Sequence, residues 1–426
     1  MSIKLRLILM NFLQYAVWGA YLTSMGNYLA GVGLAGNIGI FYAMQGIVSL
    51  FMPAVIGIVA DRWIPAQRLL SYCHLLAAAF MGAAGYYGLS AGSEVQFGTL
   101  FGLYSFSVAF YMPTIALSNS VAYTVLENHG YDSVKAFPPI RVFGTVGFIC
   151  SMLLCDVAGF QGNSRQLLQS AVIGLMLGAY ALSLPECPVN RSGDKKSFVE
   201  ALGLRAFSLF KQKKMALFFI FSMLLGVSLQ ITNGFANTFI TSFRDLPEFA
   251  DSFGANHANA LISLSQMSET LCILLIPFCL KRFGIKKVML MAMFAWVFRF
   301  GLFGLGNPGG GVWMFILSMI VYGVAFDFFN VSGSLFVNME TDTSIRSSAQ
   351  GLFMIMTNGI GATIGTLGAQ EVVNHFVNSQ TSNEAIARGW STSWLLFAAY
   401  ALVVALLFAL VFRYKHNPDQ VGEIQH

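Results

Sequence analysis

The sequence predicts an all-α membrane protein with twelve transmembrane helices in two six-helix bundles. Two observations lead to this fold class: the apolar composition of the chain and the regular return of long apolar segments. Of the 426 residues, 56% are hydrophobic and only 10% are charged, whereas an ordinary soluble domain contains about 25% charged residues. Water would not dissolve a surface of this composition, so we expect the chain to lie in a lipid bilayer.

The apolar segments have the length that a bilayer requires. A helix that crosses the hydrocarbon needs roughly 20 mostly apolar residues, and the chain offers such segments repeatedly, with short polar breaks between them. The first segment exceeds the apolar core of a signal peptide, about 7–15 residues, so we expect it to be retained. The expected spans are residues 7–29, 38–60, 69–89, 97–123, 141–161, 168–185, 214–242, 257–280, 287–306, 312–336, 347–370 and 391–413.

The charged residues of the breaks predict the orientation of the chain. Cytoplasmic loops are enriched in Lys and Arg. Most of the 24 basic residues fall in breaks that lie on the same side of the membrane as the N-terminus. We therefore expect both termini to be cytoplasmic. The net charge of +5 reflects this loop bias and does not indicate nucleic-acid binding. The six cysteines form no C-x-x-C pair and no cluster with histidine, so they are interpreted as packing residues.

A polar stretch divides the chain into two halves. Residues 187–213 contain the one dense polar run and are expected to form a cytoplasmic linker. They separate an N-terminal six-helix bundle, 1–186, from a C-terminal six-helix bundle with a short cytoplasmic tail, 214–426. A basic loop follows the second span of each half, at 57–68 and at 281–287. Both loops resemble the loop motif of the major facilitator superfamily, although the first lacks the usual Gly after Arg62 and the second lacks the Asp. Parallel repeats of six helices are typical of such transporters.

Apart from charges near the helix ends, four charged residues fall inside expected spans: Arg141, Glu269, Arg299 and Asp327. A charge at the centre of a bilayer costs about 2.5–3.5 kcal/mol on insertion scales, so such residues are functional candidates. The alternative is that the two positive and two negative groups pair for stability alone. In particular, Asp327 could balance Arg299 on the neighbouring span.

Arg141 belongs to a face that carries three kinds of chemistry. It follows the tandem prolines Pro138 and Pro139, which fit the start of a helix because their missing N–H groups are no loss there. Thr145 and Phe148 follow at spacings that place them on the same face. A guanidinium, a hydroxyl and a ring suit a ligand with polar edges and a flat face. The alternative is that Arg141 only anchors the cytoplasmic end of its helix.

Three pairs of residues repeat this pattern in the second half. Their spacing of three or four places each pair on one helix face. Carboxamides without partners would be costly in lipid, so we expect the amide pairs to face a wet interior. The alternatives are hydrogen bonds between helices for the amides and core packing for the rings. The pairs are Gln230 with Asn233, Gln266 with Glu269, and Tyr322 with Phe326.

Five long segments resemble the bacterial nucleoside–proton symporters of the major facilitator superfamily. The resemblance runs nearly end to end, except for the expected outer loops at 90–97 and 371–390 and the C-terminal tail. It implies proton-coupled nucleoside uptake by alternating access, in a multi-pass protein of the bacterial inner membrane. The segments are 137–145 (FPPIRVFGT), 221–233 (FSMLLGVSLQITN), 265–270 (SQMSET), 322–330 (YGVAFDFFN) and 348–358 (SAQGLFMIMTN).

The resemblance also implies a substrate site. Amides and a guanidinium would bind the edges of a nucleobase, a ring would cover its face, and a carboxylate or amides would bind the ribose hydroxyls. We expect Glu269 to carry the coupling proton, with Asp327 as the second candidate. Purine or pyrimidine preference, ribose or deoxyribose, and proton stoichiometry stay open. The family's site falls on Arg141, Thr145, Phe148, Gln230, Asn233, Gln266, Glu269, Tyr322 and Phe326.

Other functions remain as alternatives. Transport of a sugar or a drug, and a membrane sensor that binds a nutrient without moving it, would fit the same composition. The sequence has no G-x-S-x-G elbow, Walker loop or H-E-x-x-H helix, and its six histidines are scattered. We therefore expect neither an enzyme nor a protein with a metal or cofactor. A monomer is expected, although the sequence does not determine the oligomeric state.

Overall fold

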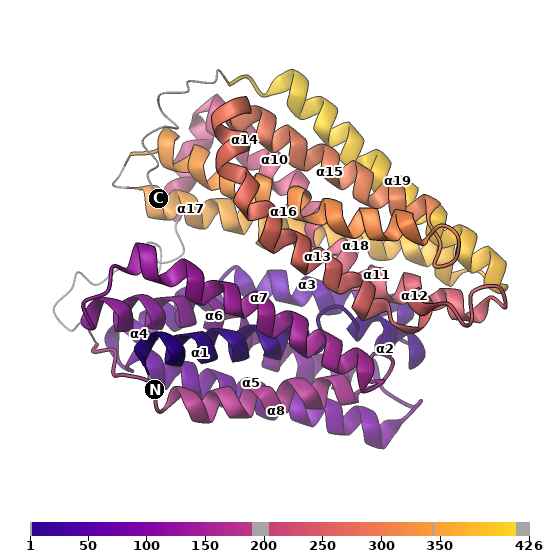
Figure 1. Cartoon of the computed structure of the whole chain (residues 1–426), viewed down its shortest axis with the longest axis horizontal. Coiled ribbons are helices and arrows are strands. Elements are labelled where there is room, and N and C mark those ends of the chain that lie inside the picture. The colour runs from indigo at the N-terminus through magenta and orange to yellow at the C-terminus, as the bar shows by residue number, and fades with distance from the viewer. Residues whose placement is uncertain (1, 190–203, 343–344, 415–426) are drawn as a thin grey trace. The chain divides into compact units, whose positions relative to one another are not determined.

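The computed structural model describes residues 2–189, 204–342 and 345–414, and these residues form helices joined by turns and short loops (Figure 1). The chain divides into two compact units, Met1–Leu202 and Gly203–His426. Their boundary falls within the segment 187–213 that the sequence predicts as a linker, of which residues 190–203 lie outside the described part. The Asp61 side chain of the first loop motif also lies outside it.

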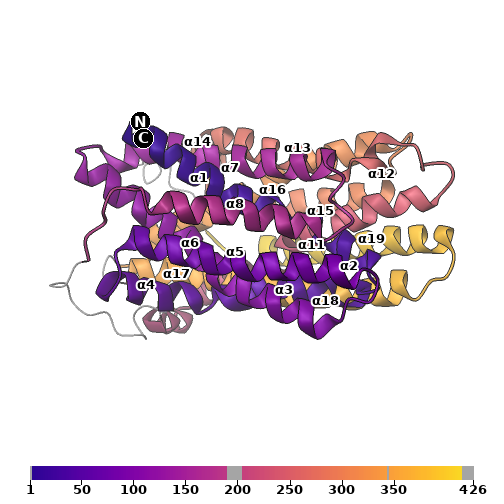
Figure 2. The ribbon, with the colours of Figure 1, turned by 90° about the horizontal axis from the view of Figure 1, so that it is seen from below.

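Unit 1 holds the first eight α-helices. Helices α5 and α8 lie side by side, and α1 packs against α7, α8 and α6 (Figures 1 and 2). The helices are α1 (Ile3–Gly19), α2 (Met25–Gly31), α3 (Ile38–Ser49), α4 (Met52–Arg62), α5 (Ala66–Ala91), α6 (Phe97–Asn128), α7 (Ser133–Val157) and α8 (Arg165–Ala181), with a 3-10 turn η1 (Ala35–Asn37).

Unit 2 begins with a 3-10 segment and continues through helices with several local irregularities. Helix α15 packs against α16 and α19, and α13 packs against α16 (Figure 1). The elements are η2 (Leu204–Lys211), α10 (Lys213–Leu229), α11 (Ile231–Ser242), η3 (Phe243–Asp245), α12 (Phe253–Asn256), α13 (Ala258–Cys272), η4 (Ile273–Leu275), α14 (Ile276–Phe283), α15 (Ile285–Leu305), α16 (Val312–Glu340), α17 (Arg346–Met354), the π-helical η5 (Ile355–Gly361), α18 (Ala362–Val373), the π-helical η6 (Asn374–Asn378) and α19 (Asn383–Val411).

The expectation of long apolar helices is confirmed. Within the described residues, nine helical runs are long and apolar enough to cross a membrane, and the bent pair α3–α4 brings the number to ten. Helices α1 and α8 have 17 residues each, which is the lower end of the range of about 17–25 residues for a span.

Two spans that the sequence predicts as continuous are interrupted in the structure. The first, 7–29, ends its helix at Gly19 and resumes at Met25. The break exposes the Leu22 carbonyl, which accepts a hydrogen bond from the Tyr42 hydroxyl instead of a helical N–H. The second, 38–60, bends by 40° between α3 and α4. Its break precedes Pro53, which cannot donate a backbone hydrogen bond and disfavours helical geometry in the preceding residue.

Glycines bring helix backbones into close contact in both units. A Cβ atom added to Gly147 of α7 would lie 2.1 Å from the Phe12 carbonyl oxygen of α1. In unit 2, a Cβ on Gly365 would lie 2.0 Å from the Val227 carbonyl oxygen, and one on Gly361 would lie 2.4 Å from that of Met223. Helix α10 therefore packs directly on the glycine-rich stretch 358–368, as small residues allow.

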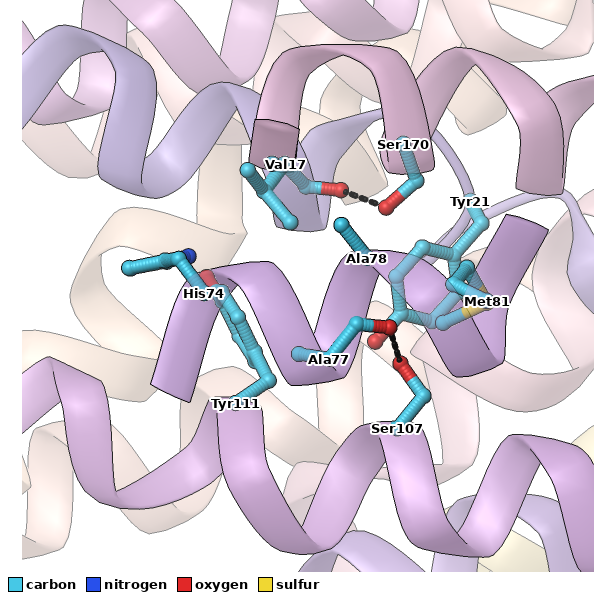
Figure 3. A pocket seen from close by; sticks show the side chains of 10 residues that line it. Val17, Tyr21, His74, Ala77, Ala78, Met81, Ser107, Tyr111 and Ser170 are labelled. Carbon is cyan, nitrogen blue, oxygen red and sulfur yellow. Dashed lines mark hydrogen bonds between the residues drawn. The ribbon is translucent and has the colours of Figure 1, made fainter. Parts of the chain in front are cut away.

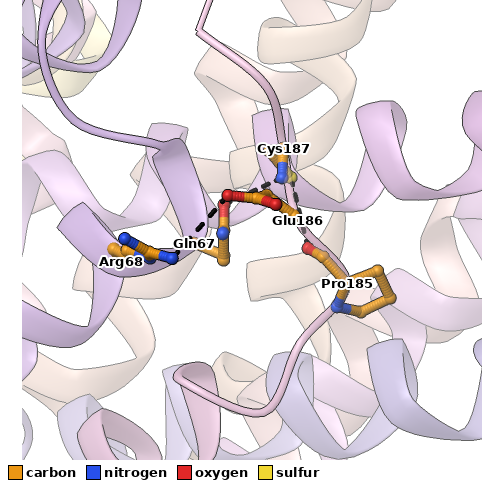
Figure 4. Close-up of polar contacts among 5 residues, drawn as sticks. All are labelled: Gln67, Arg68, Pro185, Glu186 and Cys187. Carbon is orange, nitrogen blue, oxygen red and sulfur yellow. Dashed lines mark hydrogen bonds and ion pairs between the residues drawn. The ribbon is translucent and has the colours of Figure 1, made fainter.

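Polar contacts fix the chain segment that follows α8 (Figure 4). The Cys187 N–H donates to Gln67 Oε1 at 2.9 Å, and Arg68 lies 3.7 Å from the Glu186 carboxylate. The ion pair is largely exposed and adds little stability, whereas the Gln67 bond is buried. Burial raises the pKa of the Cys187 thiol to about 11, so this cysteine stays protonated near neutral pH.

The contact between α1 and α7 predicts unequal effects of two glycine substitutions. Gly147→Ala forces the α1 backbone to move and should destabilise the protein by about 1–3 kcal/mol. Gly102→Ala, on α6 with nothing within 4 Å of the new Cβ, should stabilise it by up to about 1 kcal/mol, because alanine favours a helix. Thermal unfolding of both variants in detergent measures the difference. Equal unfolding midpoints would contradict the close packing of α1 and α7.

Candidate functional site

Arg141 lies well inside α7, which corrects the expected helix start at the tandem prolines. The helix begins at Ser133, and the Asp132 carboxylate accepts a hydrogen bond from the Lys135 N–H at 3.4 Å. An aspartate before the first turn is a favourable N-cap. Pro138 and Pro139 are therefore helical residues, and Arg141 is more than two turns from the helix end.

The Arg141 guanidinium stacks on an aromatic ring of α1. Its central carbon lies 3.9 Å from the centroid of Tyr15, within the range of a cation–π contact. Gly144 provides the space, because a Cβ there would lie 2.6 Å from the Tyr15 ring and 2.8 Å from an Arg141 nitrogen. The contact fixes the plane of the guanidinium while the side chain stays partly exposed.

Phe148 continues this face one turn beyond Thr145. Its ring is 6% exposed and meets Trp18 of α1 edge to face, at 6.4 Å between centroids. Thr145 is partly exposed between the two. Helix α1 thus supplies Tyr15 and Trp18, which the sequence analysis did not assign to the site. Their signal was the presence of large amphipathic rings inside an otherwise apolar first span.

Gln230 and Asn233 lie at a break in the first helix of unit 2. Gln230 is the single residue between α10 and α11, inside the helical run Lys213–Asp245. The two amides are in contact, as their spacing predicts, because Asn233 Nδ2 donates to Gln230 Oε1 at 2.6 Å. Both side chains are partly exposed. Both amides therefore lie at one place along this span, where α10 passes into α11.

Four of the predicted residues meet where α13 packs on α16. The Tyr322 side chain has Gln266 as a hydrogen-bond partner and Glu269 as a charged neighbour. The Tyr322 ring also stacks on Phe326, with centroids 5.7 Å apart and planes 18° apart. Tyr322 is buried, whereas Gln266, Glu269 and Phe326 are partly exposed. The arrangement presents an amide, a carboxylate and a ring beside one another.

Arg299 supports this group from behind. It is 2% exposed, its Nη1 donates to the Ser318 carbonyl at 2.8 Å and to Ser265 Oγ at 3.3 Å, and its guanidinium carbon lies 4.4 Å from the Tyr322 centroid. These contacts with a backbone carbonyl, a hydroxyl and an aromatic face stabilise the charged guanidinium. The expected pairing of Arg299 with Asp327 stays a prediction.

The described residues contain no group of three or more His, Cys, Asp or Glu side chains that could hold a metal ion. An open groove of about 440 Å³ between α15 and α16 is lined mainly by apolar side chains such as Phe294, Phe298 and Val321, and by none of the nine predicted residues.

Comparisons with known proteins were made for the whole chain. The family model described as nucleoside H+ symporter matches residues 1–417. The xanthosine permease of Escherichia coli K12 is 47% identical over 99% of this chain and 98% of its own length. The nucleoside permease NupG of the same strain is 45% identical over 98% and 97%. A crystal structure of a NupG mutant matches with a TM-score of 0.91 and 43% identity, over 97% of this chain and all of the other.

The environment of Arg299 predicts that lysine cannot replace it. Arg299→Lys keeps the charge but loses the planar group that bonds Ser318 and stacks on Tyr322. The free energy of unfolding should fall by about 1–3 kcal/mol. Arg388→Lys, at an exposed position of α19, is the matched control and should leave stability unchanged. Thermal unfolding in detergent measures both, and a fully stable Arg299→Lys protein would contradict the assigned contacts.

Proposed function

Because the chain belongs to the nucleoside–proton symporter family of the major facilitator superfamily, we propose that its nine predicted site residues bind a nucleoside and that Glu269 takes up the coupling proton. The activity itself, proton-coupled nucleoside uptake, follows from family membership. The observation that supports it is the family-model match over residues 1–417. The protein is a multi-pass membrane transporter and not an enzyme.

The chemistry of the nine residues supports a nucleoside as the ligand. Phe148 and Phe326 offer ring faces on which a flat base can stack. The Gln230 and Asn233 amides both donate and accept, as the mixed edges of a base require. Arg141 presents a planar donor group whose orientation Tyr15 fixes. Glu269 accepts hydrogen bonds from hydroxyl groups, so a ribose is a suitable partner.

The membrane arrangement is part of the proposal. Helices α1 and α8 also span the bilayer, which gives twelve spans with α3–α4 counted as one. Units 1 and 2 correspond to the two six-helix bundles, joined by the linker 187–213. Both termini are cytoplasmic, as the distribution of Lys and Arg supports, and the membrane is the bacterial inner membrane.

Uptake into proteoliposomes tests the activity directly. Purified protein should accumulate radiolabelled uridine when the outside is made acidic, and it should only equilibrate uridine when no pH gradient is imposed. A screen with labelled sugars distinguishes the alternative substrate class. Accumulation of a sugar without uridine transport would contradict the proposal. Uridine accumulation that does not depend on the pH gradient would also contradict it.

Arg141 provides a test of the binding site. Arg141→Lys keeps the positive charge but cannot present a planar fork to a base or sugar edge. We expect nucleoside affinity to fall by about 1–2 kcal/mol, comparable to a desolvated cation–π contact. Competition of uridine uptake by unlabelled nucleoside measures the affinity. Near-normal uptake by the lysine variant would show that Arg141 only anchors its helix.

Glu269 provides a test of proton coupling. Glu269→Gln should lose accumulation driven by a pH gradient but keep counterflow exchange of nucleoside, because the amide resembles the protonated acid. Both assays are run on equal amounts of reconstituted protein. Glu371→Gln, an exposed carboxylate of α18, is the matched control and should keep both activities.

Asp327 serves as the second candidate in the same assays. Asp327→Asn should keep gradient-driven accumulation of nucleoside when uptake is normalised to the amount of folded protein. If Glu269→Gln still concentrates nucleoside while Asp327→Asn does not, the proton carrier is Asp327 and the present assignment fails.

A further inference from the structure

A small cavity lies in the interior of unit 1, away from the nine site residues. Its lining comes from α1, α5, α6 and α8 and from the turn after α1 (Figure 3). The space open to the centre of a water-sized sphere is about 10 Å³, close to the roughly 10–15 Å³ that one buried water needs. Figure 3 shows His74 and Tyr111 on one side of the cavity and Tyr21 and Met81 on the other.

Hydrogen bonds behind the cavity determine which nitrogen of His74 carries a proton. The Thr114 hydroxyl donates to the Tyr111 carbonyl at 2.5 Å, so its oxygen accepts from Gln14 Nε2 at 2.8 Å. The Gln14 amide oxygen then faces His74 Nε2 at 2.7 Å. An amide oxygen only accepts, so Nε2 carries the hydrogen. His74 Nδ1 is consequently a bare acceptor.

Two of the residues that line the cavity each have a buried polar atom without a partner among the described residues: His74 Nδ1 and the Tyr21 hydroxyl. Their side chains are 0% and 1% exposed. One is an acceptor and the other carries a donor, and a buried polar group without a hydrogen-bond partner destabilises the fold. Ser107 and Ser170 also line the cavity, and each hydroxyl donates to a backbone carbonyl at 2.7 Å, so each keeps lone pairs for a further bond.

We propose that this cavity binds one water molecule that bridges Tyr21 and His74. The water accepts from the Tyr21 hydroxyl, donates to His74 Nδ1, and directs its second hydrogen to a serine hydroxyl of the wall. This completes the three hydrogen bonds that buried waters typically make. A cation does not fit, since it would need several oxygen ligands and would repel the Tyr21 hydrogen. An apolar ligand would leave both groups unsatisfied.

The bound water links the break after α1 to the centre of α5. Tyr21 belongs to the turn where the first span is interrupted, and His74 belongs to the middle of α5. Without the bridge, the Tyr21 hydroxyl has no hydrogen-bond partner among the described residues. With the bridge, the turn is tied to the same network that binds Gln14 on α1. The inference does not depend on the proposed function, because none of these residues is assigned to the nucleoside site.

Radiolytic labelling of the reconstituted protein tests the proposal. Brief X-ray exposure produces hydroxyl radicals from water, and a buried side chain is oxidised rapidly only where bound water touches it. Met81 lines the cavity and is 3% exposed, whereas Met10 of α1 is 0% exposed and does not line it. Mass spectrometry should find Met81 oxidised several-fold faster than Met10. Equal rates at the two methionines would overturn the proposal.

A variant tests the bridge itself. Tyr21→Phe removes the donor, so the water is held less well and oxidation of Met81 should fall several-fold toward the rate of Met10. Tyr86→Phe, at an exposed position on the same helix as Met81, should leave the rate unchanged. Unchanged labelling of Met81 in folded Tyr21→Phe protein would refute the role of Tyr21. If that variant does not fold, the comparison in the native protein still decides whether water is bound.

Discussion

Hydrocarbon offers no hydrogen-bond partners, so the polar groups that this chain places inside a span depend on the protein or on bound water for their hydrogen bonds. In unit 1 the Gln14 side chain meets this condition by bonding His74 and Thr114, while its carbonyl accepts from the Tyr111 hydroxyl. In unit 2 the Arg299 Nη1 atom donates to Ser265 and to the Ser318 carbonyl. These bonds join helices that are distant in sequence, and they therefore determine which faces of those helices remain available to a ligand.

Two sets of contacts hold helix α1, which restricts how the α7 residues can move. Tyr15 and Trp18 contact Arg141 and Phe148. Gln14, one turn before Trp18, enters the buried polar network through His74 and Thr114. Glycines at the α1–α7 contact leave no gap between the two backbones. A rotation of α1 would break the stacking and the buried hydrogen bonds, so the groups of unit 1 that we propose to bind the ligand are preorganised.

Composition and apolar segments were enough to predict a helical membrane protein, because the bilayer requires long apolar helices regardless of how they pack. The proximity of Gln266, Glu269 and Tyr322 could be predicted for a related reason, because polar residues in a span need a common wet face. The tandem prolines predict a later start of α7 than the structure has, because the cap that starts this helix, Asp132, lies before the apolar span. The break after Gly19 depends on Tyr42, and the position of Arg299 depends on the Ser318 carbonyl. Both partners come from other segments of the chain. Spacing within one segment carries no information about such contacts.

The difference in burial between the two carboxylates of unit 2 supports the choice of Glu269 as the proton carrier. A coupling group must exchange its proton with water and must also respond to the ligand. Glu269 is partly exposed and neighbours Tyr322, whose ring stacks on Phe326, so a ligand that contacts this group changes the surroundings of the carboxylate. Asp327 is 6% exposed and less accessible to a proton from solvent. Arg299 donates to the Ser318 carbonyl and stacks on Tyr322, so the ring that neighbours Glu269 is held in place by buried contacts while the carboxylate itself stays accessible.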